Sequence, residues 1–193
     1  MIGANITCHC GACGFAIHDD QPTLSLLCGC TDCRQALEWC AERGGLEPVS
    51  LPELIYVKSD IVNVFGLEFM QVFQLNQNAR STRVYCNNCF SIIGVDHKSY
   101  RDNVFMFFKN HCVTTSDLSI KPSAAIFLKE LKDTNQINQL KNIPFIFCFS
   151  KKETQRFRSI RAVSGSFNDI KRTRHGQTLK SLIKSISKVV ILN

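Results

Sequence analysis

Short apolar segments separated by turn-forming polar residues predict a chain built mainly from β-strands. A period of two runs from Ile6 to Ile17 and predicts one strand, with Cys8 and Cys10 on the same face. Ile126–Leu140 has mixed helical potential, and Pro144–Phe149 has the pattern of a short strand. Turn-forming polar residues separate further predicted strands at Leu24–Leu27, Leu54–Lys58, Val62–Phe65, Phe69–Leu75, Arg83–Tyr85, Ser91–Val95 and Val104–Lys109.

Two segments have the pattern of helices. Good helix formers dominate Asp32–Arg43, and Gly44 and Gly45 end that run. Gln177–Asn193 is predicted to be one amphipathic helix, because its apolar side chains follow helical spacing while its lysines share another face. We expect this helix to pack on the core with its basic face in solvent; the alternatives are contact with a membrane surface or with nucleic acid.

Composition and charge divide the chain into two parts. With 193 residues, of which 45% are hydrophobic, the chain is long enough to bury a core. We expect a β domain over residues 1–150 and a basic extension over residues 151–193, packed on the same domain. The extension has eleven Lys/Arg against Glu153 and Asp169, a net charge of +9, whereas residues 1–150 have 12 basic and 14 acidic residues, a net charge of −2. This asymmetry predicts an acidic partner for the extension.

The hydrophobic runs indicate neither a membrane span nor a signal peptide. A transmembrane helix needs roughly 18 or more apolar residues, and no such run occurs in the sequence. Met1–Asn5 lacks both a basic region and the start of a long apolar region. Together with the reduced cysteines expected below, these features predict a cytoplasmic protein.

Seven of the eleven cysteines lie in three tight clusters. Their spacings of one or two residues are those of zinc-binding turns rather than of a disulfide framework. The members of the three clusters are Cys8 and Cys10; Cys28, Cys30 and Cys33; and Cys86 and Cys89.

Seven thiolates are enough for two zinc ions, one held by four sulfurs and one by three. Spacing leaves open whether Cys86 and Cys89 share an ion with Cys8 and Cys10 or with two of the three central cysteines. Other candidates are less suited: a predicted strand points His9 away from its neighbours, and a helix places Cys40 about 10 Å beyond Cys33. The remaining cysteines, Cys13, Cys112 and Cys148, lie among apolar residues and are predicted to be buried thiols.

These motifs resemble the family of glutathione-dependent formaldehyde-activating enzymes, which also includes centromere protein V. The family pattern C-x-C-G-x-x-x-F is matched from Cys8 to Phe15, and its C-x-C-x2-C pattern is matched from Cys28 to Cys33. Its later F-C-x2-C-G is matched by Tyr85-Cys86-Asn87-Asn88-Cys89, with Phe90 in place of the final glycine. The similarity covers roughly residues 5 to 130.

The resemblance implies a β-tent fold of antiparallel sheets pinned by zinc. It also implies a structural zinc at Cys8, Cys10, Cys86 and Cys89 and a catalytic zinc at Cys28, Cys30 and Cys33. The implied activity is that of a carbon–sulfur lyase, which condenses formaldehyde with glutathione.

Three arginines near these motifs are candidates for binding the carboxylates of glutathione or a related thiol: Arg34, Arg80 and Arg83. Two other functions fit the same sequence. The protein could be a non-catalytic zinc-stabilised β module that binds a protein partner, or a nucleic-acid binder that uses its basic extension.

Overall fold

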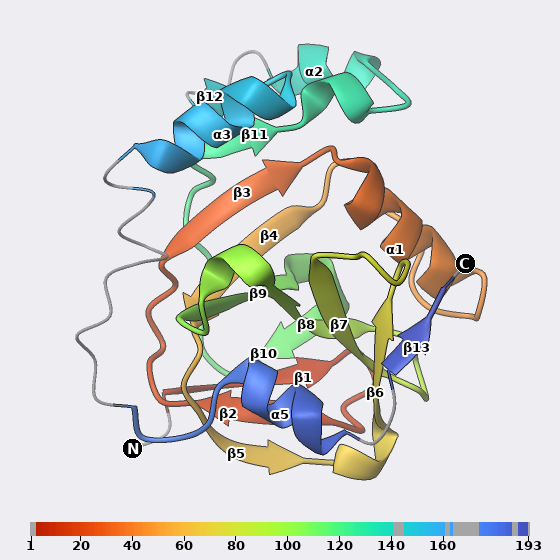
Figure 1. The fold of residues 1–193 in the computed structure, drawn as a ribbon, viewed down its shortest axis with the longest axis vertical. Helices are drawn as coiled ribbons and strands as arrows, with labels where there is room; N and C mark the ends of the chain where they lie inside the picture. Colours follow the sequence, from red (N-terminus) through yellow and green to blue (C-terminus); the bar gives the residue numbers. More distant parts are fainter. Residues whose placement is uncertain (1–2, 141–144, 161–162, 164–173, 187–188, 193) are drawn as a thin grey trace.

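The computed structural model describes residues 3–140, 145–160, 163, 174–186 and 189–192. These residues form two β-sheets surrounded by short helices, so the prediction of a mainly β protein is confirmed (Figure 1). Within the described residues, no helix combines the length and the apolar character needed to cross a membrane.

The smaller sheet has the strand order β10-β1-β2-β5 and is antiparallel throughout. Its strands are β1 (Ala4–Cys8), β2 (Gly14–Ile17), β5 (Ile61–Phe65) and β10 (Cys112–Thr114). The predicted single strand from Ile6 to Ile17 is therefore wrong, because the chain turns back between Cys8 and Gly14. Gly11 adopts a φ of 75° in this turn, and its N–H donates to the Cys8 carbonyl.

The larger sheet has the strand order β12-β11-β3-β4-β9-β8-β7-β6-β13. Pairing from β3 to β6 is antiparallel, whereas β11 is parallel to β3 and β12, and β13 is parallel to β6. Its strands are β3 (Leu24–Cys28), β4 (Glu53–Lys58), β6 (Met70–Gln74), β7 (Ser81–Cys86), β8 (Ile92–His97), β9 (Val104–Phe108), β11 (Ala124–Ile126), β12 (Ile146–Phe147) and β13 (Val189–Ile191).

Polar capping side chains define the ends of the helices. The Cys30 sulfur caps α1 by accepting the Cys33 N–H, and Ser150 and Glu153 form a reciprocal capping box at α3. The α-helices are α1 (Thr31–Ala41), α2 (Asn135–Leu140), α3 (Lys151–Ser159) and α5 (Leu179–Ser185). Single 3₁₀ turns occupy η1 (Leu67–Phe69), η2 (Lys98–Tyr100), η3 (Lys109–His111) and η4 (Leu128–Glu130).

The predicted C-terminal helix is shorter than the sequence pattern indicates. Its expected span of Gln177–Asn193 is wrong, because α5 ends at Ser185 and the chain returns to strand at β13. Leu179 and Leu182 face the core, as the amphipathic pattern predicts.

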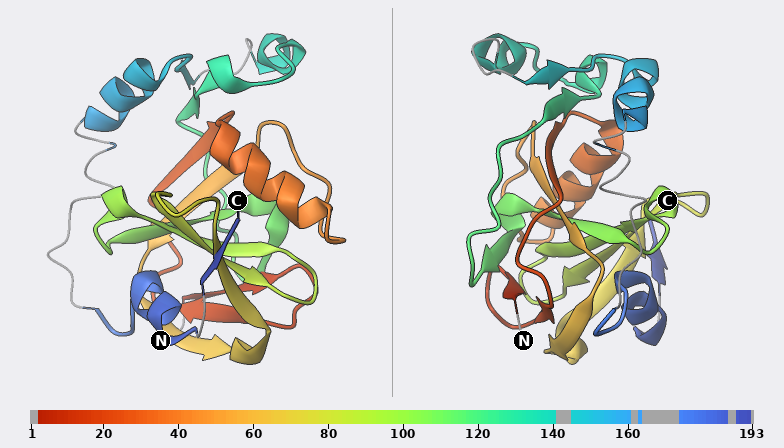
Figure 2. Two further views of the ribbon diagram at one scale, coloured as in Figure 1. Left: turned by 45° about the vertical axis from the view of Figure 1, so that its right-hand side comes forward. Right: turned by 90° about the vertical axis from the view of Figure 1, so that its left-hand side faces the viewer.

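The larger sheet is buried on both faces, so its strands are apolar at consecutive positions. In β4, Leu54 and Tyr56 face one side with α1, whereas Ile55 and Val57 face the other side with the smaller sheet and α5. Accordingly, α1 lies toward one end of the molecule, and the smaller sheet with α5 lies toward the other (Figure 2). Phe157 of α3 joins the core on the α1 side.

Candidate metal sites

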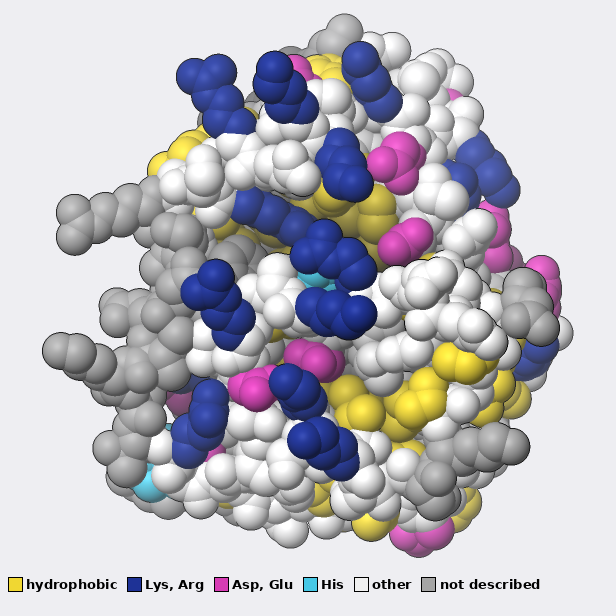
Figure 3. All heavy atoms as spheres, viewed as in Figure 1, with side chains coloured by type: hydrophobic (Ala, Val, Ile, Leu, Met, Phe, Trp, Pro, Cys, Tyr) yellow, Lys and Arg dark blue, Asp and Glu magenta, His cyan; other side chains and the backbone are white. Residues whose placement is uncertain are grey.

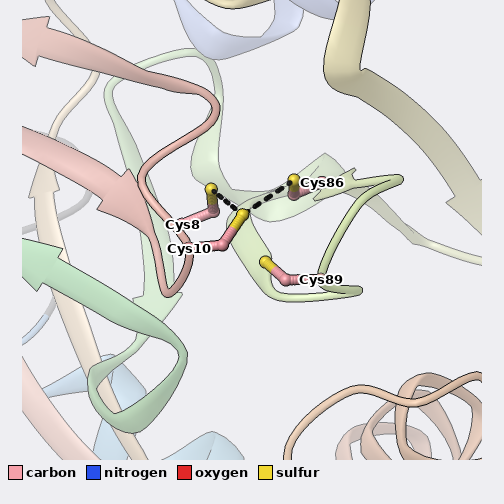
Figure 4. Close-up of side chains that lie close together, drawn as sticks. All are labelled: Cys8, Cys10, Cys86 and Cys89. Carbon is pink, nitrogen blue, oxygen red and sulfur yellow. Dashed lines mark hydrogen bonds between the residues drawn. The ribbon is translucent and has the colours of Figure 1, made fainter.

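Four cysteine sulfurs converge where β1 and β7 end (Figure 4). The Sγ atoms of Cys8, Cys10, Cys86 and Cys89 all lie within 4.8 Å of one another. Cys10 Sγ is 3.6 Å from Cys8 Sγ and 3.9 Å from Cys86 Sγ. A tetrahedral zinc with bonds of about 2.3 Å would space its sulfurs by about 3.8 Å, whereas a disulfide needs about 2.0 Å. All eleven cysteines are free, and this cluster has the donor atoms and spacing of a metal site.

Both turns that carry these thiols use left-handed backbone conformations. Gly11 follows Cys10, and Phe90 follows Cys89 with a φ of 52°. Glycine is favoured in that region, so Phe90 holds a backbone conformation that residues with a side chain rarely adopt. Here Phe90 also packs against Tyr85, with the two ring centroids 6.0 Å apart.

Burial raises the pKa of Cys8 and also that of Cys86, to about 12, whereas hydrogen-bond donors favour the thiolate of Cys10. The Cys13 N–H donates to Cys8 Sγ at 3.4 Å, and the Asn88 side-chain amide donates to Cys10 Sγ at 3.3 Å. Burial alone would raise the pKa of Cys10, but donors from Ala12 and Asn88 outweigh it and lower that pKa to about 6. Cys10 is therefore suited to be an anionic ligand, and the charge of a bound metal ion would be needed to ionise Cys8 and Cys86.

A second group of three cysteines lies at the start of α1. The sulfurs of Cys28, Cys30 and Cys33 lie within 4.8 Å of one another, and Cys33 Sγ is 3.8 Å from Cys28 Sγ. Cys28 ends β3, Cys30 caps α1, and Cys33 lies in its first turn. Among the described residues, no fourth Cys, His, Asp or Glu belongs to this group. These three residues could hold a metal ion and leave one position for another ligand.

The pKa of Cys30 lies well below that of an ordinary thiol. The Cys28 and Cys33 thiols stabilise its thiolate, as does the Cys33 backbone N–H at 3.3 Å. The positive charge of Arg83 also favours the thiolate, and the N-terminus of α1 adds its positive end. The same contacts between the thiols raise the pKa values of Cys28 and Cys33, so Cys30 is the sulfur of this group that ionises first when no metal is bound.

The structure places the three predicted arginines in different surroundings. Arg83 is buried beside the three-cysteine group, and its Nη2 donates to the Asp32 carbonyl at 3.3 Å. Arg34 lies next to Cys33, but its Nη1 donates to the Glu130 carbonyl at 2.7 Å. Of these three arginines, only Arg83 keeps buried N–H groups without acceptors among the described residues.

Arg80 is exposed and lies in a basic region of the surface. Burial lowers the pKa of His97 to about 4, and positive charges add to that effect, with Arg80 the largest contributor among them. Figure 3 shows Lys and Arg side chains gathered near a histidine at the centre of one face.

Arg158 is a further arginine, not predicted from the sequence, that α3 brings toward the three-cysteine group. Its guanidinium carbon is 5.9 Å from the Phe127 ring centroid, and its buried Nε has no acceptor among the described residues. Burial alone would lower the pKa of Arg158, but Tyr56, Tyr100 and Cys28 raise it. No local pattern marks Arg158, because only tertiary packing brings α3 close to Cys28.

The cysteines outside the two groups are buried or half-buried single thiols. Burial is the main factor that raises the pKa of Cys40 to about 12, and it also raises the pKa values of Cys13, Cys112 and Cys148. His9 is exposed, and its backbone N–H donates to Ser91. None of these side chains belongs to either cysteine group.

A third set of metal-type side chains, His18, Asp60 and His175, lies near the start of α5. The two imidazole rings are stacked, with centroids 3.7 Å apart and planes 5° apart. An imidazole binds a metal within its ring plane, so parallel stacked rings do not converge on one ion. Asp60 instead accepts the backbone N–H groups of His175 and Gly176, which anchors the chain ahead of α5.

No protein-family model matches this chain, and no curated protein matches it either. The features of the structure that bear on function are the two cysteine groups and the charged residues around the second group.

Proposed function

We propose that this protein is a zinc-dependent carbon–sulfur lyase, which joins a small aldehyde to a thiol such as glutathione. The observation that carries the proposal is that the two cysteine groups differ in their number of sulfur ligands. One has four sulfurs, and the other has three with a buried arginine beside them. Four thiolates close a tetrahedral zinc site, whereas three leave room for a substrate.

The sulfur positions fit zinc in both groups. The distances of 3.6, 3.9 and 3.8 Å agree with the spacing of about 3.8 Å expected for tetrahedral zinc thiolates. We propose Cys8, Cys10, Cys86 and Cys89 as ligands of a structural zinc, and Cys28, Cys30 and Cys33 as ligands of a second zinc. When bound to three thiolates, zinc would lower the pKa of a thiol in its remaining position.

Residues around the second group would orient an anionic thiol. Arg158 brings positive charge near Cys28 and Cys30, Arg34 adjoins Cys33, and Arg80 is exposed. A guanidinium can bind a carboxylate through two N–H groups, so a peptide thiol such as glutathione suits these surroundings. The paired sheets and the zinc-binding turns further support a β-tent architecture, and reduced cysteines suit a cytoplasmic setting.

Metal quantification with calorimetric titration of glutathione tests the proposal. We expect two zinc ions per chain and binding of one glutathione. Cys30→Ser should lose one zinc and the binding of glutathione, whereas Cys148→Ser, the control at a buried thiol outside both groups, should retain both. A wild-type protein with a single zinc and no affinity for glutathione would instead support a non-catalytic zinc module.

A further inference from the structure

Arg83 is a buried cation whose hydrogen bonds are incomplete. The residue is only 2% exposed, and Nη2 donates to the Asp32 carbonyl at 3.3 Å. Within the part of the chain that the structure describes, Nε and Nη1 have no acceptor, and no carboxylate pairs with the guanidinium. Burying a charged group without partners is costly, so these N–H groups indicate an acceptor that arrives with a ligand.

The sheet directs Arg83 toward the three-cysteine group. Arg83 lies in β7 between Phe73 of β6 and Val95 of β8, and both neighbours belong to the part of the core that contains Cys28. The Phe73 ring lies 5.6 Å from the guanidinium carbon. Asp32 stands between Cys30 and Cys33, so the bond from Nη2 holds the guanidinium against the turn that carries these sulfurs.

The proposed reaction needs a donor for oxygen as well as a site for sulfur. Attack of a thiolate on an aldehyde moves an electron pair onto the carbonyl oxygen, which then needs hydrogen-bond donors. The one position left by three protein thiolates is taken by the sulfur of the substrate. The donors to oxygen must therefore come from the protein, and Nε and Nη1 of Arg83 offer N–H groups that have no other acceptor among the described residues.

We propose that Arg83 is a catalytic residue that binds the aldehyde oxygen and stabilises the oxyanion formed when the thiol adds. This inference rests on the proposed function. The thiol loses its proton to water, its sulfur forms the C–S bond, and the C=O π pair moves to oxygen. That oxygen then takes a proton from water, so thiol and aldehyde combine as a hydroxyalkyl thioether. Arg83 stays protonated throughout, because a guanidinium does not lose its proton in proteins.

The alternative is a structural role, in which Arg83 only balances the negative charge of the thiolates. A substitution of Arg83 distinguishes this structural role from the catalytic role. Loss of charge balance would weaken binding of zinc and of glutathione. Loss of an oxyanion donor would slow addition while leaving both binding steps unchanged. Arg43 is the control, since it is an exposed arginine just beyond the end of α1, where its Nη1 donates to the Trp39 carbonyl, and it lies in neither cysteine group.

The test combines exchange NMR of ¹³C-formaldehyde with glutathione, glutathione calorimetry and zinc quantification. We expect Arg83→Met to slow the catalysed exchange by about 100-fold, as the loss of one oxyanion donor does. Both zinc ions should be retained, and the glutathione affinity should stay within about threefold of wild type. Arg83→Lys, which keeps the charge but not the planar guanidinium, should recover only part of the rate, and the control Arg43→Met should exchange at close to the wild-type rate.

A readout that does not depend on turnover accompanies the rates. The ¹⁵N resonance of the Arg83 Nε–H, identified by its loss in Arg83→Lys, should shift when formaldehyde is added to the protein with glutathione. The inference is overturned if Arg83→Met exchanges at the wild-type rate, if it loses zinc or glutathione binding, or if Arg158→Met alone shows the rate defect. Absence of glutathione binding and of accelerated exchange in wild type would overturn the proposed function itself.

Discussion

His111 shows how burial changes the chemistry of a single side chain. The imidazole is fully buried, and its Nδ1 accepts the Ile92 N–H at 3.2 Å. Nε2 has no partner among the described residues. Burial, followed by the charge of His9, lowers the pKa of His111 to about 4, so the ring is neutral at pH 7.

This shift predicts a loss of stability in mild acid. The unfolded chain binds a proton at His111 below pH 6.5, but the folded protein binds it only near pH 4. The contribution of neutral His111 to the free energy of unfolding is therefore fully present above pH 6.5. About 2 kcal/mol of this contribution should be lost at pH 5. Urea unfolding at pH 7 and pH 5 measures the loss in wild type and in His111→Gln.

The glutamine side chain of His111→Gln retains an acceptor for the Ile92 N–H but does not titrate. The variant should therefore lose about 2 kcal/mol less than wild type between the two pH values. Protonation of the thiols affects both proteins alike and cancels in the comparison. Equal losses in the two proteins would contradict the assignment to His111.

At the scale of elements, the C-terminal segment divides between a helix and a strand. Leu179, Leu182 and Ile186 are buried against the core that includes β1 and β2. Beyond α5, Val189–Ile191 pairs in parallel with Val72–Gln74 of β6. These β-branched residues suit a strand, and they cover an edge that would otherwise expose unpaired backbone groups.

The packing of α5 predicts unequal effects at nearby helical positions. Leu182 is 1% exposed, so Leu182→Ala should lower the free energy of unfolding by about 2–5 kcal/mol through lost contacts and a cavity. Lys180 is exposed and pairs with Asp102 at 3.4 Å, so Lys180→Ala should cost less than about 1 kcal/mol. Chemical denaturation of the two variants measures the difference, and similar costs would show that α5 does not pack as described.

At the scale of the whole molecule, the four-cysteine group joins the two sheets. Cys8 ends β1 of the smaller sheet, and Cys86 ends β7 of the larger sheet. A metal at this point would cross-link segments that are far apart in the chain, and its binding energy would add to folding. The three-cysteine group, in contrast, lies within residues 28–33 and closes no long loop.

The two groups should therefore respond differently to the loss of a ligand. We expect Cys86→Ser to lose its cooperative unfolding transition, because structural zinc contributes about 10 kcal/mol or more in small domains. Removal of zinc from the wild-type protein with a chelator should have the same effect. Cys30→Ser should keep the fold, since a serine hydroxyl also caps α1. Circular dichroism during thermal unfolding separates the two cases, and a cooperative, wild-type-like Cys86→Ser would contradict a structural role.

Local patterns were sufficient for much of the fold. Short apolar runs bounded by turn-forming residues predicted the central strands of the larger sheet, and the composition after Asp32 predicted α1. These signals depend on neighbours within a few residues, which also explains their errors. The alternation from Ile6 to Ile17 continued through a turn at Gly11, so two strands were predicted as one. The helical spacing continued past Ser185, although the residues after it pair with the edge strand β6.

The three cysteine clusters could be recognised without any structure, because ligand spacing within a turn is a local property. Which clusters meet, and which cations lie beside them, depended on the packing of the folded chain. Cys10 and Cys86 are brought together by two sheets, and Arg83 and Arg158 reach the three-cysteine group from β7 and α3. Such contacts join residues about 50 or more positions apart, and packing of the whole core, rather than any local pattern, selects them.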